Sequence, residues 1–337
     1  MSTLAPMPPI WVMGAGSIGV FVGGRLAAAG ASVVFIGRPR IQADIQAHGL
    51  SLSDLEASTQ SVSPTRIEWH TEVPVGAPEP GLVLLTVKSL ATAEAAAALA
   101  AVLPAGTCVL SLQNGVDNAA LAARAAPGLK LLAGMVPFNV AELRPGHFHR
   151  GSSGQIAAQD DPVLRRYQAA FVAAGLPMQL HGDLLTVQWA KLLLNLNNPV
   201  NALSGLTLRE QLLHAGWRRC TAALMEEALR VLRAAKIAPA RLTPVPASAI
   251  PFLMRLPTPL FRLAAARMLR IDPKARSSMA DDLNAGREPE IDALCGAVVR
   301  LGAQQGVPTP RNAAMQHLLQ ARRTLPLPDV QAALALD

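Results

Sequence analysis

Short apolar runs alternate with helix-forming segments through the first half of the chain. The strand-like runs lie near residues 10–13, 32–36, 82–87, 107–111, 131–138, 146–158 and 177–181. The run at 82–87, LVLLTV, is almost wholly apolar, as expected of a strand that is covered on both faces of a parallel sheet. Strands and helices that alternate in this way predict a doubly wound α/β domain.

From about residue 182 the periodicity changes from strand-like to helical. Helical patterns cover residues 184–200, 210–235, 260–269, 277–286, 291–306 and 311–324. Five prolines between residues 244 and 259 interrupt this half and predict an irregular bridge or short helices. Because 337 residues are long for one core, we expect an α/β domain at 1–182 and an all-helical domain at 183–337.

Composition predicts a folded cytoplasmic protein. Hydrophobic residues make up 51% of the chain, which excludes a disordered protein. Glu94 interrupts the best candidate for a membrane span, and residues 1–9 lack the basic and apolar segments of a signal peptide. Cys108, Cys220 and Cys295 are widely spaced in apolar surroundings, and they predict reduced core thiols with no metal site.

The net charge of +7 leaves two interpretations open. One is a basic surface that only faces solvent. The other is a field that attracts an anionic cofactor and an acidic substrate. Nucleic-acid binding is disfavoured because the chain has one tyrosine, few other aromatic residues and no basic stretch interleaved with them.

The first apolar run leads into a glycine-rich turn and then into a small, apolar helix-forming segment. The turn has the sequence Gly14-Ala15-Gly16-Ser17-Ile18-Gly19. In a dinucleotide fingerprint, Gly14 permits the turn, Gly16 lets backbone N–H groups approach a pyrophosphate, and Gly19 lets helix and strand pack closely. The phosphates then lie at the positive end of a helix. The segment therefore predicts a Rossmann-type nucleotide site.

The end of the second strand predicts which nucleotide binds. An NAD site usually has an acidic residue there for the ribose 2′-hydroxyl, whereas this chain has Gly37-Arg38-Pro39-Arg40. Guanidinium groups suit a 2′-phosphate. Arg38 therefore predicts NADP(H).

Two polar residues directly follow two other strands. Lys88 comes after the run at 82–87, and Asn114 follows the run at 107–111. Parallel strands end at one edge of a sheet, so both residues are candidates for cofactor contacts at the edge that carries the glycine turn. Each has a simpler interpretation: an exposed loop lysine for Lys88, and an Asn-Gly turn for Asn114.

An unusual polar face lies on the first helical stretch of the second half. On a helix, Lys191, Asn195 and Asn198 are spaced i, i+4 and i+7 and share a face. Buried amides cost stability unless they find partners, so this face predicts either a ligand site or a set of caps and helix–helix hydrogen bonds. Pro199 predicts a kink in the same stretch.

A third cluster starts at Ser277-Ser278-Met279 and continues to Glu290-Ile291-Asp292. Either serine is suited to cap a helix. Taken alone, Glu290 is best explained as an acidic residue in the first turn of a helix that follows Pro289.

Taken in order, these segments resemble the ketopantoate reductase family (2-dehydropantoate 2-reductase). The matching pieces are Gly14-x-Gly16-x-x-Gly19, Arg38, Val87-Lys88, Gln113-Asn114-Gly115, Lys191-Leu192-x-x-Asn195 and Ser277-Ser278-Met279 with Glu290-Ile291-Asp292. They span nearly the whole chain, and the ordered set is far more specific than the glycine motif alone. The resemblance implies a Rossmann-type domain followed by a 6-phosphogluconate-dehydrogenase-like helical domain. It also implies an NADPH-dependent oxidoreductase that converts 2-dehydropantoate to (R)-pantoate in pantothenate and coenzyme A synthesis.

By resemblance, each matching residue receives a role. Lys191 would be the general acid, and Glu290 would meet a substrate hydroxyl or the cofactor. The implied substrate contacts are Asn195, Asn198, Asn201 and Ser278. The implied cofactor contacts are the glycine turn from Gly14 to Gly19, with Ala15, Ser17 and Ile18, together with Arg38, Lys88, Asn114 and Val140.

The chain departs from the family pattern on the substrate side. The family commonly has an asparagine eight residues after the lysine and just before a proline, but here Pro199 occupies that position and Asn198 precedes it. A further family asparagine falls near Thr207 or Leu208, where this chain has none. Reduction of another branched 2-keto acid and non-catalytic NADP(H) sensing therefore stay open. We expect a small-molecule keto acid as partner, no nucleic acid or membrane, and a monomer or homodimer.

Overall fold

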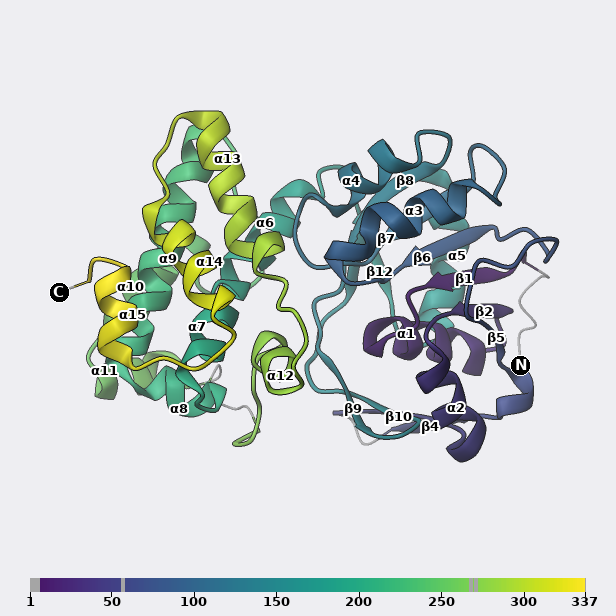
Figure 1. Ribbon diagram of the computed structural model, residues 1–337, viewed down its shortest axis with the longest axis horizontal. Helices are drawn as coiled ribbons and strands as arrows, with labels where there is room; N and C mark the ends of the chain where they lie inside the picture. Colours follow the sequence, from purple (N-terminus) through teal and green to yellow (C-terminus); the bar gives the residue numbers. More distant parts are fainter. Residues whose placement is uncertain (1–6, 56–57, 267–268, 270–271, 337) are drawn as a thin grey trace. The chain divides into compact units, whose positions relative to one another are not determined.

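The computed structural model describes residues 7–55, 58–266, 269 and 272–336. The chain folds into two compact units, residues 1–184 and residues 185–337. The first unit is built on a mainly parallel sheet and the second is helical (Figure 1). This confirms the expected fold class. Among the described residues, none of the helices is long and apolar enough to cross a membrane.

The first unit contains an eight-stranded sheet in the order β12-β11-β8-β7-β6-β1-β2-β5. In that order the strands are Met178–His181, Ile156–Gln159, Lys130–Met135, Cys108–Ser111, Leu82–Leu85, Ile10–Met13, Val33–Ile36 and Glu68–His70. All neighbours pair in parallel except β11 and β8. The central strand β1 lies between β2 and β6, with Val12 opposite Phe35 on one side and Leu84 on the other. The chain order therefore reverses at β1, which is where open α/β sheets bind their ligands.

Helices cover both faces of this sheet, as the apolar strands predict. On one face, α1 (Ser17–Ala28) and α5 (Pro162–Ala173) share a buried core with Val12, while α3 (Thr92–Ala100) and α4 (Asn118–Ala125) share the core of the other face with Val83. Figure 1 shows α3 and α4 above the strands and α1 below them. Because both faces are covered, β6 has no polar position, and it ends at Leu85 rather than at residue 87.

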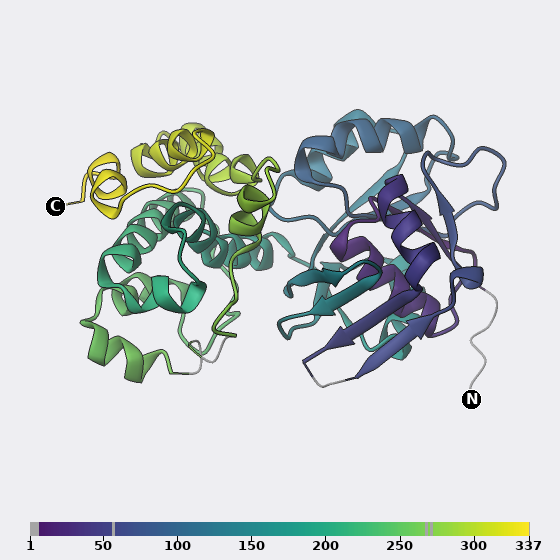
Figure 2. The same cartoon turned by 60° about the horizontal axis from the view of Figure 1, so that its bottom comes forward.

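A second sheet, which the sequence pattern did not predict, lies against α1. Its strand order is β4-β3-β10-β9, and its strands are Thr59–Val62, Leu50–Asp54, His147–Arg150 and Val140–Arg144. Figure 2 shows these strands beside α1. The strand-like segment at 146–158 forms two short strands, β10 and β11, which belong to different sheets. Buried Arg25 of α1 links to this sheet through Asp54, at 3.4 Å, and donates to the carbonyl oxygen of Ala174.

The second unit is all helical around one long, largely buried helix, α9 (Ala215–Ala234). Its other helices are α6 (Leu185–Asn195), α7 (Asn197–Ser204), α8 (Leu208–Leu213), α10 (Ile250–Arg255), α11 (Thr258–Ala264), α12 (Ser278–Asn284), α13 (Ala297–Gln305), α14 (Pro310–Gln320) and α15 (Leu327–Ala333). The last residues of the helix expected over 260–269 fall partly outside the described residues, and α11 ends at Ala264.

Two of the expected long helices are each broken into two. The helix expected over 184–200 is α6 and α7, with Leu196 between them. Pro199 has no N–H to donate to the carbonyl of Asn195, so the helical hydrogen-bond series stops there. The helix expected over 210–235 is α8 and α9, because His214 has an extended backbone with ψ of 112°.

The proline-rich stretch contains short helices, as expected, and Arg218 of α9 holds it in place. The Arg218 side chain is fully buried and donates to the carbonyl oxygens of Leu212, Met254 and Leu256 at 2.7–3.0 Å. Its guanidinium also lies 4.3 Å from the ring centroid of Phe261. A buried charge with several acceptors and an aromatic face can remain ionised in the core, so these interactions fix α10 and α11 against α9.

Candidate active site

The glycine-rich turn after β1 is shaped by close backbone packing. Gly14 has φ of +101°, and a Cβ there would lie 2.7 Å from the backbone of Thr86 and Val87. A Cβ on Gly19 would lie 2.6 Å from the Gly14 oxygen, so neither position accepts a larger residue. Around Gly16, in contrast, no atom of the described chain lies within 4 Å of an added Cβ. The backbone is therefore open on the side where a pyrophosphate would approach.

The start of α1 is suited to an anion. Gly16 is its N-cap, and no side chain among the described residues caps the free N–H groups of this helix end, whose first turn has no acidic residue. Ser17 and Ile18 supply the first two helical N–H groups, while the N–H of Ala15 donates to Ile36. Uncapped N–H groups together with the helix dipole attract phosphate. The described residues thus fit a dinucleotide here.

The two arginines after β2 have different surroundings. Arg38 is exposed at the N-cap of α2 (Pro39–His48), and its side chain has no ion-pair partner in the described chain. Arg40 binds two carboxylates, Asp44 at 2.6 Å and Glu142 at 2.9 Å. These carboxylates, Glu142 foremost, raise the pKa of Arg40 above its usual value. Arg38 is therefore the arginine that is available to a 2′-phosphate.

Lys88 and Asn114 lie in the loops after β6 and β7, at the edge where β1 leads into the glycine turn. Lys88 is exposed and Asn114 is half-buried. A buried polar network joins the two loops: Gln113 donates to the Val87 carbonyl at 2.9 Å and to Thr92 Oγ1 at 2.6 Å. Such a network holds two loops in fixed relation.

Sequence reasoning did not predict this network. Gln113 accepts from Ser111, Thr92 donates to Asn118, and Asn118 donates to Ser89. Gln113, Thr92 and Asn118 are all buried. Gln113 stands in the Gln113-Asn114-Gly115 motif, where the sequence pointed only to ligand contact by its neighbour Asn114. Polar residues at the end of a buried strand were the available signal.

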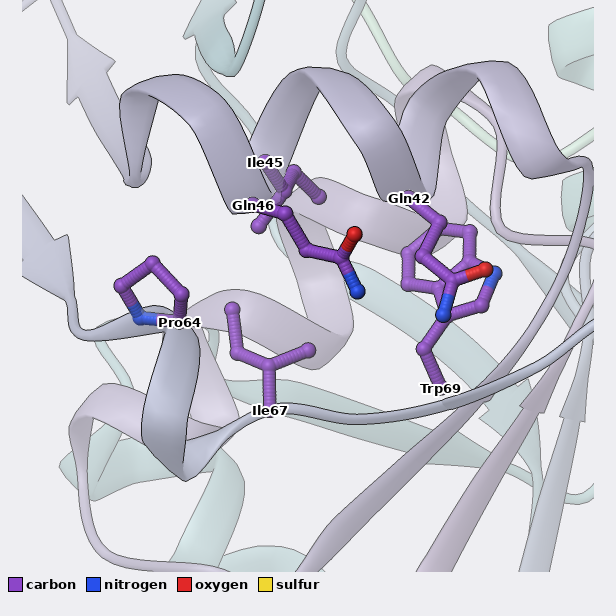
Figure 3. Close-up of a pocket in the computed structure, with 6 residues that line it drawn as sticks. All are labelled: Gln42, Ile45, Gln46, Pro64, Ile67 and Trp69. Atoms are coloured by element: carbon purple, nitrogen blue, oxygen red, sulfur yellow. The ribbon is translucent and has the colours of Figure 1, made fainter.

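Val140 and a small pocket lie elsewhere in the first unit. Val140 is the first residue of β9 and is half-buried against the core on the α1 side. The pocket has a volume of about 140 Å³ and lies between α2 and the segment that contains β5; it is lined by Gln42, Ile45, Gln46, Pro64, Ile67 and Trp69 (Figure 3). None of the residues predicted from the sequence lines it, so it is separate from the predicted cofactor contacts.

In the second unit, Lys191 lies half-buried on α6. Burial lowers the pKa of its ammonium from 10.5 to about 8, and the negative charge of Glu290 partly opposes this shift. Burial destabilises the charged form, whereas a nearby carboxylate stabilises it. An ammonium with a pKa near neutrality is suited to give a proton to a developing alkoxide.

The asparagines that follow Lys191 fall into two groups. Asn197 bonds Gln211 and Thr221, and Asn201 is fully buried, donating to the Leu206 carbonyl and accepting from the Ser277 N–H. The side chains of Asn195 and Asn198 are half-buried and make no hydrogen bond to another described residue. Lys191 and Asn195 both lie on α6 at the predicted spacing of four residues, but α6 ends at Asn195 and Asn198 belongs to α7. The single continuous helix expected over the three residues is therefore wrong.

The two serines of the third cluster, Ser277 and Ser278, have different surroundings. Ser277 is buried and caps α12: its Oγ accepts from the Ala280 N–H and donates to the Asn198 carbonyl. Ser278 is exposed at the first position of α12, and its hydroxyl has no hydrogen-bond partner among the described residues. The simpler interpretation, a helix cap, thus applies to Ser277, and Ser278 is free to meet a ligand.

Models of one protein family match both units. The model described as Ketopantoate reductase PanE/ApbA matches residues 10–162, and the one described as Ketopantoate reductase PanE/ApbA C terminal matches residues 183–323. The 2-dehydropantoate 2-reductase of Halobacterium salinarum is 28% identical over 310 residues, covering 89% of this chain and 93% of that protein. The enzyme of the same description from Mesorhizobium japonicum is 27% identical over 333 residues, with the same two coverages of 89% and 93%.

Solved structures give the same fold. A PanE/ApbA family ketopantoate reductase from Ralstonia eutropha has a TM-score of 0.77 at 29% identity and covers 96% of this chain and 99% of that chain. A D-mandelate dehydrogenase solved with NADH and anilino(oxo)acetate has a TM-score of 0.75 at 20% identity and covers 98% of this chain and 100% of that chain. At that identity the second likeness concerns the fold alone.

Proposed function

Since the chain belongs to the ketopantoate reductase family, a family of nicotinamide-dependent oxidoreductases, we propose that it reduces 2-dehydropantoate to (R)-pantoate with NADPH. Lys191 is the general acid of this reaction. The observation that carries the proposal is the half-buried Lys191 ammonium, whose pKa falls to about 8, in the same unit as the unengaged side chains of Asn195, Asn198 and Ser278.

Lys191 performs the proton step. Bound NADPH supplies a hydride to the 2-keto carbon of the substrate, and negative charge then develops on the keto oxygen. The Lys191 ammonium stabilises that charge and gives its proton to the oxygen. The Glu290 carboxylate keeps Lys191 protonated to a higher pH than burial alone would allow.

The remaining residues bind and orient. Asn195 and Asn198 have amides that are free to hold the keto acid, and Ser278 offers its exposed hydroxyl to the carboxylate of the substrate. Asn201 does not hold the substrate in this proposal, because its amide already donates to Leu206 and accepts from Ser277. Its role is to hold the start of α12 against α7.

Preference for NADPH rests on Arg38. The N-terminus of α1 is open to the pyrophosphate, and the end of β2 presents the exposed Arg38 where an NAD site usually has an acidic residue. Lys88, Asn114 and the backbone at Val140 complete the proposed cofactor contacts.

The substrate is tested by a panel of keto acids at saturating NADPH. We expect kcat/KM to be highest for 2-dehydropantoate, and lower by at least about 10-fold for 2-oxoisovalerate and phenylglyoxylate, which lack its terminal hydroxyl. The second candidate, a reductase of another branched 2-keto acid, is favoured by Pro199 in the position of the family asparagine. A higher kcat/KM for either of the two other acids would replace the proposed substrate with that class.

The pH dependence of the reduction should report Lys191. Only the ammonium form donates a proton, so we expect kcat/KM for the keto acid to be level below pH 8 and to fall tenfold per unit above it, because the pKa of Lys191 is about 8. Initial rates from pH 6 to pH 10 measure this, with NADPH saturating. A rate that keeps rising through pH 9.5 would be inconsistent with Lys191 as the proton donor.

A further inference from the structure

A turn of π-helix (Asp292–Gly296) begins two residues after Glu290 and continues directly into α13. A π turn holds an extra residue compared with an α turn, and such turns are rare and often mark functional sites. Compared with a continuous α-helix, the extra residue rotates the residues before the turn by roughly 100° about the helix axis, relative to those after it. The direction in which the chain enters at Glu290 therefore depends on this turn.

Three side chains, Asp292, Arg300 and Gln316, hold the π turn, and we name them the Asp292 clasp. Nη1 of Arg300 lies 2.9 Å from both carboxylate oxygens of Asp292, and Nη2 donates to the Asp292 carbonyl oxygen at 3.0 Å. Gln316, on α14, donates to Oδ1 of Asp292 at 3.3 Å. Asp292, at the start of the π turn, is thus bonded both from α13 and from α14.

Gly296, the last residue of the π turn, makes room for the clasp. A Cβ at this position would collide with Oδ1 of Asp292, and it would lie 2.8 Å from Nε2 of Gln316 and 3.0 Å from Nη1 of Arg300. All three members of the clasp therefore converge on the space that the missing side chain leaves. Asp292 and Arg300 are exposed, and what links their ion pair to the π turn is the convergence with Gln316 on Gly296.

The clasp bears on the proposed general acid through Glu290. Among the described residues, the carboxylate of Glu290 is the charge that opposes the effect of burial on Lys191. The strength of that interaction falls with distance, so it depends on how firmly Glu290 is held. No member of the clasp itself is among the residues proposed to touch substrate or cofactor.

We propose that Asp292, Arg300 and Gln316 are positioning residues that hold Glu290 where it interacts with Lys191. This inference rests on the proposed role of Lys191 as general acid. When the clasp is broken, Glu290 samples more distant positions and stabilises the Lys191 ammonium less. Lys191 then loses its proton at lower pH, and the fall of the reduction rate above pH 8 moves to lower pH.

The test compares pH profiles of kcat/KM for the keto acid at saturating NADPH. For Arg300→Gln and Asp292→Asn we expect the alkaline fall to begin a few tenths of a pH unit lower, so that kcat/KM drops by about two- to threefold at pH 9 and by less than about 1.3-fold at pH 7. The KM for NADPH should not change. Because both variants remove the same contact, the double variant should be no worse than the poorer single one.

Two further variants serve as references. Glu290→Gln removes the carboxylate itself and should shift the profile in the same direction and further. Arg322→Gln removes an exposed pair with Glu288, at 3.3 Å, which is only two residues from Glu290 but outside the clasp, and it should leave the profile unchanged. If the clasp variants lose too much stability, Gln316→Ala, which removes one 3.3 Å bond, gives the same comparison in milder form.

The outcomes separate the two proposals. If Glu290→Gln shifts the profile but Arg300→Gln, Asp292→Asn and Gln316→Ala do not, the clasp is only structural and the inference is overturned. If Glu290→Gln also leaves the pH profile of kcat/KM unchanged, Glu290 does not stabilise the Lys191 ammonium, and that part of the proposed function is refuted instead. An equal shift in Arg322→Gln would also overturn the inference, because the effect would not be particular to the clasp.

Discussion

Replacement of Lys191 by alanine should lower kcat for keto acid reduction by about 10²- to 10⁴-fold, the range typical of a lost general acid. The reason is that the developing alkoxide loses both its proton donor and the positive charge beside it. The dissociation constant for NADPH should change by less than about threefold, because the residues proposed to hold the cofactor all belong to the first unit. The measurement is steady-state kinetics together with fluorescence titration of NADPH.

The Lys191→Ala variant should still fold. Below about pH 8 the folded protein keeps the Lys191 proton, so it pays the desolvation cost of a buried charge. Removal of the side chain relieves this cost at pH 7, which offsets part of the stability lost with its packing contacts. Lys191→Met, which retains most of the apolar volume, is the matched control and should have the same kinetic defect. Turnover near the wild-type value in either variant would refute the general-acid role.

Replacement of Arg38 by alanine should raise the KM for NADPH by roughly 10- to 100-fold and leave the KM for NADH within about twofold. A charge-assisted hydrogen bond to a phosphate is worth about 1.5–3 kcal/mol. NADH has no 2′-phosphate, so its binding does not depend on this bond. The kinetics are measured with both cofactors at a fixed, saturating keto acid concentration.

Arg40→Ala is the matched control for Arg38. Arg40 lies two residues further along the same helix start but is bonded to Asp44 and Glu142. Its removal should change the preference between the two cofactors much less than removal of Arg38. An unchanged preference in Arg38→Ala, or a larger effect in Arg40→Ala, would assign the 2′-phosphate to another group.

The sequence predicted well those parts of the fold that depend on local pattern. The apolar runs near residues 10–13, 32–36, 107–111 and 177–181 are strands of the parallel sheet, and the glycine turn lies between β1 and α1. The small sheet escaped prediction because its strands are short and half polar. β4, for example, is Thr59–Val62 with only Val62 buried, and its neighbour β3 is recognisable mainly once α1 is known to cover Leu50 and Leu52.

The candidate site shows a similar limit. The sequence indicated amides near Lys191 but not which of them are free, since this depends on distant partners such as Gln211 for Asn197 and Ser277 for Asn201. Pro199 predicted the kink, but only the three-dimensional structure shows that Asn198 belongs to a separate helix, α7. The π turn after Glu290 likewise depends on Arg300 and Gln316, which are 8 and 24 residues from Asp292.

The most direct test of the proposed function is transfer of deuterium from NADPH labelled with two deuterium atoms at nicotinamide C4. The protein is incubated with this cofactor and unlabelled 2-dehydropantoate, and the product is analysed by mass spectrometry and chiral chromatography. We expect (R)-pantoate that carries one deuterium at C2. Tight binding of NADPH without any labelled pantoate would contradict the account and favour a protein that binds the cofactor without reducing this keto acid.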